Sequence, residues 1–208
     1  MKQASVADDA ALAAYLGQWV DVAPEEARAL RAYARRCTWE RGATLFPLGG
    51  EADDLILLTE GVVRSFYLHD DREVNLRLLC APAAALPYNS FLLGTTADEA
   101  LQAPSPGTGY RVRFRAFCRE RPGLLAEAVR RELAERHFIA LQRRLRMLQA
   151  RTAAQRYAYF RAHMPPEIVA GTPAYHVASY LGITPESLSR VKADLEKCQG
   201  NADPPPAD

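Results

Sequence analysis

The side chains best suited to recognising another molecule lie in residues 172–195, TPAYHVASYLGITPESLSRVKADL. Glu186, Ser187 and Arg190 are expected on the exposed face of a short helix. An arginine can donate two hydrogen bonds to a guanine, and a glutamate can accept one from a cytosine. This segment therefore predicts base recognition, with Arg190 as the strongest candidate. The side chains better suited to phosphate or backbone contacts are Tyr175, His176 and Lys192.

Two short helices around Gly182 must position these residues. Ala178 is small enough to let the second helix approach closely, and four residues later Gly182 accepts the left-handed backbone of a turn. Thr184 is a good N-cap and Pro185 suits the first helical position, so the second helix is predicted to begin there. The apolar contacts between the helices are assigned to Val177, Leu181, Ile183, Leu188 and Val191. The pattern predicts a helix-turn-helix whose second helix, Thr184 included, enters the major groove of DNA.

Two alternatives remain open for this motif. A helical hairpin of this spacing can be merely structural. Arg190 can also form an ion pair with Glu186, because the two residues are four positions apart on one helix.

The charge of the 208-residue chain is nearly balanced, at +1, but it is unevenly distributed. Residues 119–161 contain eleven arginines and four glutamates, whereas residues 172–198 contain three cations and three acids. An arginine-rich run is commonly a solvated helix face, and it can also attract phosphate. DNA affinity would therefore have to draw on the arginine-rich segment or on dimeric binding.

One long helix is predicted over residues 122–150, which contain no proline after Pro122. Ala134, Phe138, Leu141, Leu145 and Leu148 form a heptad-like seam on it. The helix either packs on its own β-domain or pairs with the same helix of a second subunit. About 30 helical residues span roughly 45 Å, too long for one small β-domain to cover. A homodimer through Phe138, Leu141, Leu145 and Leu148 is therefore favoured.

The first part of the chain predicts an α+β fold. Residues 8–37 have helical periodicity, and short strand-like runs with turn signals between them fill residues 39–115, as in a β-sandwich or barrel. The expected strands cover residues 42–46, 55–58, 62–68, 74–79, 99–103 and 109–114. A turn is expected at Asp70-Asp71. The polar, proline-rich residues 200–208 are expected to be disordered.

Several classes of protein are disfavoured by composition. The four cysteines form no C-x-x-C pair, which argues against a zinc site and fits a reducing cytoplasm. No apolar run is long enough to span a membrane, and the N-terminus lacks a signal-peptide pattern. A metal enzyme of the cupin type needs clustered histidines, and only His69 lies in the β-domain. We expect a cytoplasmic protein that is not an enzyme, with no metal and no cofactor.

The sequence resembles the Crp/Fnr family of transcription regulators. The segments that carry the resemblance are YHVASYLGITPESLSRVK at 175–192 and DLILLTEGVVRSFY at 54–67. The resemblance implies a jelly-roll sensor domain like those that bind cyclic nucleotides (1–121), a dimerisation helix (122–150), a helix-turn-helix domain of winged-helix type (151–198) and a tail (199–208). It also implies duplex DNA, a second copy of the chain, RNA polymerase and a small-molecule effector as partners. A protein-interaction or ligand-binding module without DNA binding is the alternative.

The chain departs from the family at specific positions. The family's base-reading positions fall on Pro185, Glu186 and Arg190, and the first is often arginine in members that respond to cyclic AMP. The Gly-Glu and Arg-Ser pairs that hold the cyclic phosphate align with Leu86-Pro87 and Ala97-Asp98, and Glu99 follows. Carboxylates would repel the phosphate, so we expect no cyclic AMP binding there. No strand pattern follows the second helix, so the wing is expected to be reduced or absent.

Other sensing chemistries are weakly supported. Residues 1–36 hold no cysteine, unlike the iron–sulfur members of the family, and His69 alone is weak evidence for haem. A pocket for another small molecule is a hypothesis for Tyr88, Asn89, Ser90 and Phe91. The alternative for these four residues is a loop that closes the end of the barrel.

Overall fold

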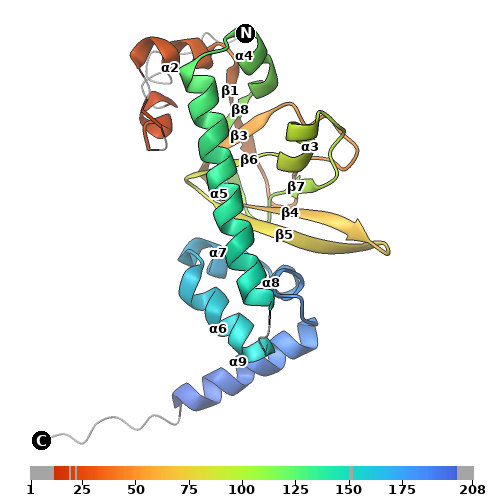
Figure 1. Ribbon diagram of the computed structural model, residues 1–208. Helices are drawn as coiled ribbons and strands as arrows, with labels where there is room; N and C mark the ends of the chain where they lie inside the picture. Colours follow the sequence, from red (N-terminus) through yellow and green to blue (C-terminus); the bar gives the residue numbers. More distant parts are fainter. Residues whose placement is uncertain (1–11, 19, 22, 150–151, 201–208) are drawn as a thin grey trace, which may run out of the picture.

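The computed structural model describes residues 12–18, 20–21, 23–149 and 152–200. It consists of a β-sandwich beside a long helix, α5, and of a helical unit at the C-terminal end of that helix (Figure 1). The helices are α2 (Pro24–Arg31), α3 (Tyr88–Leu93), α4 (Phe114–Glu120), α5 (Leu124–Leu148), α6 (Ala153–His163), α7 (Pro166–Gly171), α8 (Ala174–Leu181) and α9 (Pro185–Gly200). The α+β prediction is confirmed.

Two four-stranded antiparallel sheets form the sandwich, in the orders β1-β8-β3-β6 and β2-β7-β4-β5. The strands are β1 (Ala34–Trp39), β2 (Thr44–Phe46), β3 (Leu55–Glu60), β4 (Val62–His69), β5 (Arg72–Cys80), β6 (Ala83–Ala85), β7 (Ala100–Gln102) and β8 (Gly107–Val112). Buried apolar side chains of both sheets, among them Phe46, Ile56, Val63 and Leu101, fill the space between them. The crossing connections between the sheets are those of a jelly roll.

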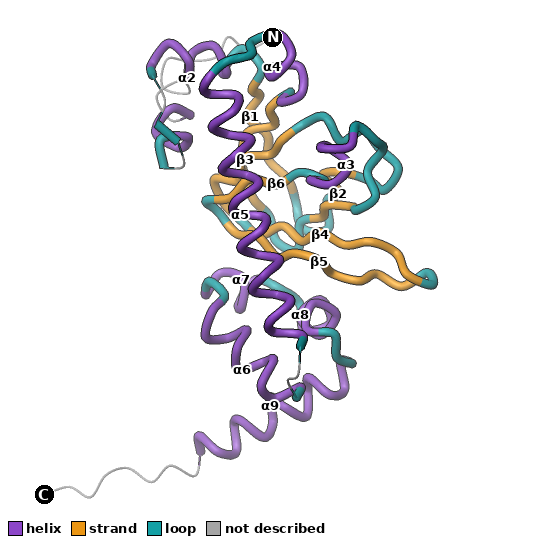
Figure 2. The backbone as a smooth tube through the Cα atoms, in the orientation of Figure 1, coloured by secondary structure: helices purple, strands orange, loops and turns teal. Residues whose placement is uncertain are grey.

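Strands β4 and β5 form a long hairpin that projects beyond the sandwich (Figure 2). Its register runs from Val62 opposite Cys80 to His69 opposite Arg72. Asp70 and Asp71 make the tight turn between them, both with positive φ, as the sequence predicts. The hairpin carries the polar residues that hold α8.

The helical prediction for residues 8–37 is wrong at its C-terminal end. Helix α2 ends at Arg31, and Ala34–Trp39 is strand β1, paired with β8. Alanine and arginine favour helix locally, but the ladder to β8 and the burial of Ala34 and Trp39 outweigh that preference. The prediction missed β6, α3, α4 and α7, whose short lengths give little periodicity.

Helix α5 joins the parts of the molecule. Its first half buries Leu125, Ala126, Val129 and Leu133 against the sheet that contains β1, β3 and β8. Near its end Met147 is buried in a second core, which α6, α7, α8 and α9 share with Val62 and Leu78 of the sandwich. The C-terminal unit therefore packs directly on the hairpin strands.

No strand follows α8 in the described part of the chain, where α9 is the last element and reaches Gly200. Residues 201–208, most of the tail expected to be disordered, lie outside the described residues.

Candidate nucleic-acid interface

The joint between α8 and α9 has the geometry of a helix-turn-helix. Gly182 adopts a left-handed conformation (φ +63°), and a Cβ there would lie 3.3 Å from Arg156 Nη1. The Ile183 amide donates to the Ala178 carbonyl oxygen (3.1 Å). The Ser187 amide donates to Thr184 Oγ1 (3.2 Å), so Thr184 caps α9 as predicted.

The inner faces of the two helices form a packed core with α6. Val177, Ala178, Leu181 and Leu188 are buried among Tyr157 and Phe160. Ile183 and Val191 pack partly against the same cluster. The five apolar positions assigned to this contact are thus all in or against the core.

Arg156 of α6 fixes the joint from outside. Its Nη1 donates to the carbonyl oxygens of Leu181 (3.0 Å) and Gly182 (3.3 Å), and its Nη2 donates to that of Leu148 (2.9 Å). One guanidinium therefore satisfies free carbonyl oxygens at the ends of both α8 and α5. No sequence pattern singled out Arg156 among the arginines of this stretch.

The outer face of α9 is open. Thr184, Pro185, Glu186 and Arg190 are exposed, and Ser187 is half-buried. The structure records no ion pair between Arg190 and Glu186, although it describes both residues. The three base-reading positions that the family resemblance implies therefore lie on one exposed helix face.

The three residues predicted to contact phosphate differ in their exposure. Tyr175 is 58% exposed, whereas Lys192 is half-buried with its Nζ 5.7 Å from the centre of the Tyr157 ring. His176 is only 5% exposed. In this structure α8 places the ring against the β4–β5 hairpin, and the phosphate contact of His176 stays a prediction.

A buried polar cluster joins α8 to that hairpin. Asn75 donates from its backbone amide to Ser179 Oγ (3.0 Å) and from Nδ2 to the His176 carbonyl oxygen (3.2 Å). Ser179 Oγ in turn donates to the Glu73 carbonyl oxygen (3.1 Å). Arg64, 1% exposed, donates to Asn75 Oδ1 (2.9 Å) and holds the amide in place. We call Arg64, Asn75, His176 and Ser179 the α8 latch.

The latch holds the histidine ring neutral. Burial, and secondarily the Arg64 guanidinium, lowers the pKa of His176 to about 4. His137 of α5 lies near another buried arginine, Arg77, and its pKa also falls to about 4, with burial as the main cause.

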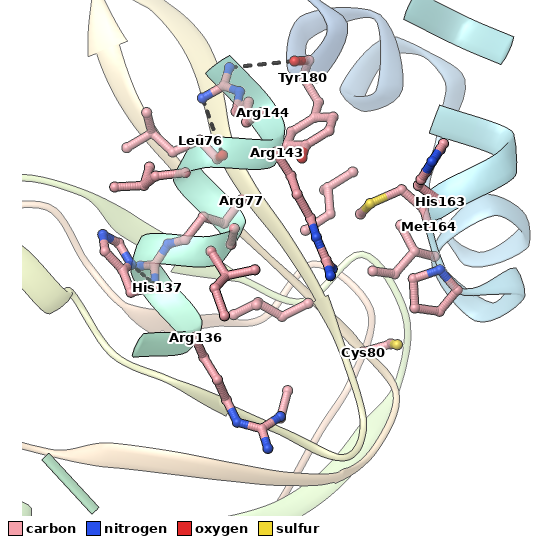
Figure 3. A pocket seen from close by; sticks show the side chains of 18 of the residues that line it. Leu76, Arg77, Cys80, Arg136, His137, Arg143, Arg144, His163, Met164 and Tyr180 are labelled. Carbon is pink, nitrogen blue, oxygen red and sulfur yellow. Dashed lines mark hydrogen bonds between the residues drawn. The ribbon is translucent and has the colours of Figure 1, made fainter. Parts of the chain in front are cut away.

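Arg144 of α5 makes a second bridge to α8. Its Nη1 donates to the Leu76 carbonyl oxygen (3.2 Å) and its Nη2 to that of Tyr180 (3.4 Å), as Figure 3 shows. Helix α8 is therefore held at two points, by the sandwich and by α5.

Next to Ala97-Asp98, which aligns with one of the family's phosphate-binding pairs, the structure contains a buried ion pair. Arg77 and Glu99 are 8% and 5% exposed, and Arg77 Nη2 donates to Glu99 Oε1. The same carboxylate oxygen accepts from the Tyr88 amide (3.2 Å), and Arg77 also donates to the Leu86 carbonyl oxygen (2.9 Å). The carboxylate that was expected to repel a phosphate thus has an internal cation as its partner.

The four residues proposed for an effector pocket all belong to helix α3, whereas the alternative was a loop that closes the end of the barrel. Ser90 Oγ donates to Asp98 Oδ1 (2.5 Å) and Asn89 Nδ2 donates to Asp98 Oδ2 (3.0 Å). These hydrogen bonds lower the pKa of Asp98. Phe91 is buried against Phe114, and Tyr88 alone of the four lines the cavity described below.

The predicted dimer seam is partly exposed. Phe138, Leu141 and Leu145 are 62%, 43% and 51% exposed, so they form an uncovered apolar strip on α5. Leu148 differs, because it packs against the core of the C-terminal unit. Its place in that core explains its apolar character without a second subunit.

The sandwich, the long helix and the C-terminal helix-turn-helix together make the fold of Crp/Fnr-type transcription regulators. FixK2 from Bradyrhizobium japonicum is 19% identical, with a TM-score of 0.67 over 84% of this chain and 89% of that one. A regulator assigned to the Crp/Fnr family from Eubacterium rectale is 15% identical, with a TM-score of 0.69 over 88% of each chain. At these identities the likeness is one of fold.

A third similar structure is CLP of Xanthomonas campestris, described as a global regulator responsive to cyclic di-GMP. It is 17% identical, with a TM-score of 0.63 over 83% of this chain and 91% of that one. No protein-family model and no curated protein matches this sequence. Among the described helices, none has the length and apolar character needed to cross a membrane.

Proposed function

We propose that this protein is a sequence-specific regulator of transcription that binds duplex DNA as a homodimer and has no catalytic activity. The observation that carries the proposal is the exposed outer face of α9. It presents Glu186 and Arg190 on a helix whose inner face packs on the C-terminal core through Leu188. Arg190 would donate to guanine in the major groove, and Glu186 would accept from cytosine. Exposed Tyr175 would contact the phosphate backbone.

Dimerisation rests on the strip of Phe138, Leu141 and Leu145. These side chains are exposed in the single chain at helical spacing, as in a helix that pairs with its copy. Two copies paired along α5 would each present one α9, about 34 Å apart, to successive turns of DNA. A regulator of this kind works in the cytoplasm and acts with RNA polymerase.

The effector in this proposal is not cyclic AMP. Binding a cyclic phosphate inside the jelly roll would require displacing Glu99 from Arg77 and from the Tyr88 amide. Leaving a buried charge without its partner costs about 3–5 kcal/mol. The sandwich is therefore proposed to be a structural core, and any effector acts elsewhere.

The test is selection of bound sequences from random duplex DNA by the full chain at about 50 mM salt, where phosphate contacts are strongest. We expect a two-fold symmetric consensus. Arg190→Ala should relax preference at one base position in each half-site, at a cost of about 1–3 kcal/mol. The control is Arg41→Ala, which removes an exposed cation from a loop of the sandwich. Selection of no sequence would overturn the proposal and leave an interaction module without DNA binding.

Dimerisation is tested separately by sedimentation. Leu145→Ser on the strip is expected to shift the chain toward monomer, whereas Leu93→Ser on α3, which is 68% exposed, should not. A wild-type chain that is monomeric at all concentrations would contradict the dimer and leave the DNA contact to be judged by the selection alone.

A further inference from the structure

A cavity of about 540 Å³ lies where the sandwich, α5 and the C-terminal unit meet (Figure 3). Strands β5 and β6 form one wall, α5 a second, and α6 with the start of α7 a third. The buried core residues between the two sheets do not line it, whereas Arg77 of the Arg77–Glu99 pair does. Its volume is within the usual range for small-molecule sites.

Most of the cavity surface is apolar. Leu78, Met147, Phe160 and Ile168 are buried core residues that also line it. Cys80 and Met164 face the cavity from opposite walls (Figure 3). Burial raises the pKa of the Cys80 thiol, so this side chain stays neutral. Such a surface suits the hydrocarbon part of a ligand.

The polar groups at the cavity are mainly cationic. Arg136 and Arg143 extend from α5 beside it, with Arg143 between Cys80 and Met164 in the view of Figure 3. Glu132 is the one carboxylate among the lining residues, and it already accepts from Arg136 Nε (2.5 Å). The Arg143 side chain has no hydrogen bond or ion pair within the part of the chain that the structure describes.

We propose that this cavity binds an amphipathic organic anion, which consists of an apolar body and a single carboxylate or phosphate head. Arg143 pairs with the head, because a guanidinium can form two parallel hydrogen bonds with either group. The body lies along Cys80, Met164 and Ile168. Neither a neutral hydrocarbon nor a small polar anion would satisfy both parts of this surface.

The position of the cavity links ligand binding to the orientation of α9. Its walls belong to three parts of the molecule whose relative placement sets where α9 points, so a bound ligand would stabilise one placement over others. This coupling rests on the proposed function, since its readout is DNA affinity. Binding of the anion does not depend on it.

The binding test is calorimetric titration of the full chain, without DNA, with decanoate below its micellar concentration. Decyl phosphate, decanol and acetate are titrated in parallel. We expect decanoate or decyl phosphate to bind, and their relative affinities to identify the preferred head group. Decanol and acetate should bind at least about tenfold more weakly, because each lacks one half of the recognised chemistry.

The discriminating variant is Arg143→Gln, matched by Arg146→Gln three residues further along the same helix, exposed and outside the cavity. Loss of a charge-assisted hydrogen bond should weaken decanoate about tenfold to a hundredfold in Arg143→Gln, with Arg146→Gln unchanged. Cys80→Phe, which places a ring in the apolar part of the cavity, should weaken decanoate binding while circular dichroism shows the native fold.

Three results would overturn the proposal: no binding of either decyl anion at millimolar concentration, equal binding of decanol, or equal loss in both arginine variants. The first result is also the one expected if a second copy of the chain fills the cavity in the dimer. Because these titrations contain no DNA, their failure is separate from failure of the DNA proposal. With an operator in hand, decanoate should change its affinity in the wild type and not in Arg143→Gln.

Discussion

The two helices of the helix-turn-helix are held in opposite ways. Five residues of α8 are buried, and they face both the C-terminal core and the sandwich. Helix α9 buries Leu188 on its inner side and leaves its outer side open. Helix α8 therefore fixes the position of the helix-turn-helix, and the outer side of α9 is free to contact another molecule.

The difference shows where a signal can act on DNA binding. Within the part of the chain that the structure describes, helix α9 makes no hydrogen bond to the sandwich, and it packs on α6 and α8. Hydrogen bonds fix helix α8 to the hairpin, between His176 and Ser179 of α8 and Asn75 and Glu73 of the hairpin. Hydrogen bonds specify orientation more strictly than apolar contact does, and they exchange partners when the orientation changes. The α8 latch thus couples α8 to the sandwich, whereas Arg144 couples it to α5.

The largest effect in this comparison is expected on the inner face of α9. Leu188→Ala removes a side chain that is 1% exposed in the core shared with α6 and α8. We expect a loss of about 2–5 kcal/mol in the free energy of unfolding, from lost burial and the cavity left behind. Urea denaturation followed by circular dichroism measures it.

Arg190→Ala on the same helix is the matched control. Its side chain is exposed, so its unfolding free energy should change by no more than about 0.5 kcal/mol. Comparable destabilisation by the two variants would show that α9 is packed on both sides. That result would contradict the open outer side of α9.

A smaller loss is expected when the latch is opened. Asn75→Ala leaves Arg64 Nη1 and the His176 carbonyl oxygen without their partner. A buried polar group left unsatisfied costs about 1–3 kcal/mol. Hydrogen exchange should increase in α8 more than in α5, because α5 keeps its contacts with the sandwich. Asn89→Ala on α3, whose side chain bonds Asp98 near the surface, is the control. Equal exchange in both variants would mean that apolar packing alone holds α8.

The sequence predicted the turn between α8 and α9 better than it predicted the contacts that hold α8 to the rest of the molecule. Gly182, Thr184 and the apolar positions are local signals, because each acts within a turn or two of helix. The latch was not predictable, since Asn75 and Ser179 lie 104 positions apart and nothing local marks them as partners. The burial of His176 was not predictable for the same reason, because the hairpin that covers its ring is distant in sequence.

The sensor domain gives a similar lesson. The strand pattern predicted most of the sandwich, but β1 was taken for helix because its partner β8 is distant in sequence. Alignment with the family predicted that Glu99 would exclude a phosphate. It did not predict that Arg77 would neutralise that carboxylate, because the arginine enters from another strand.

The latch also predicts a dependence of stability on pH. The pKa of His176 and that of His137 are about 4 in the folded chain, below the usual value of 6.5. The unfolded chain therefore binds protons first, so stability is complete above pH 6.5 and falls as the pH drops from 6.5 toward 4. Denaturation midpoints across this window measure the slope.

The histidine variants separate the two contributions. His176→Gln should reduce the slope, because only His137 then remains of the pair. His69→Gln at the exposed hairpin tip is the matched control. A slope that His176→Gln leaves unchanged would show that the ring is not confined by Arg64 and Asn75.

The smallest effect is expected at the first turn of α9. Thr184→Ala removes the oxygen that accepts from the Ser187 amide, and loss of such a cap costs about 1 kcal/mol. Because Pro185, Glu186 and Ser187 follow directly, fraying there moves the candidate base-contacting residues without touching the latch. We expect DNA affinity to fall with little change in the hydrogen exchange of α8, whereas Thr184→Ser should retain both. If Thr184→Ala instead loosened α8 as much as Asn75→Ala does, the two helices would respond as one unit, and the division between positioning and contact would not hold.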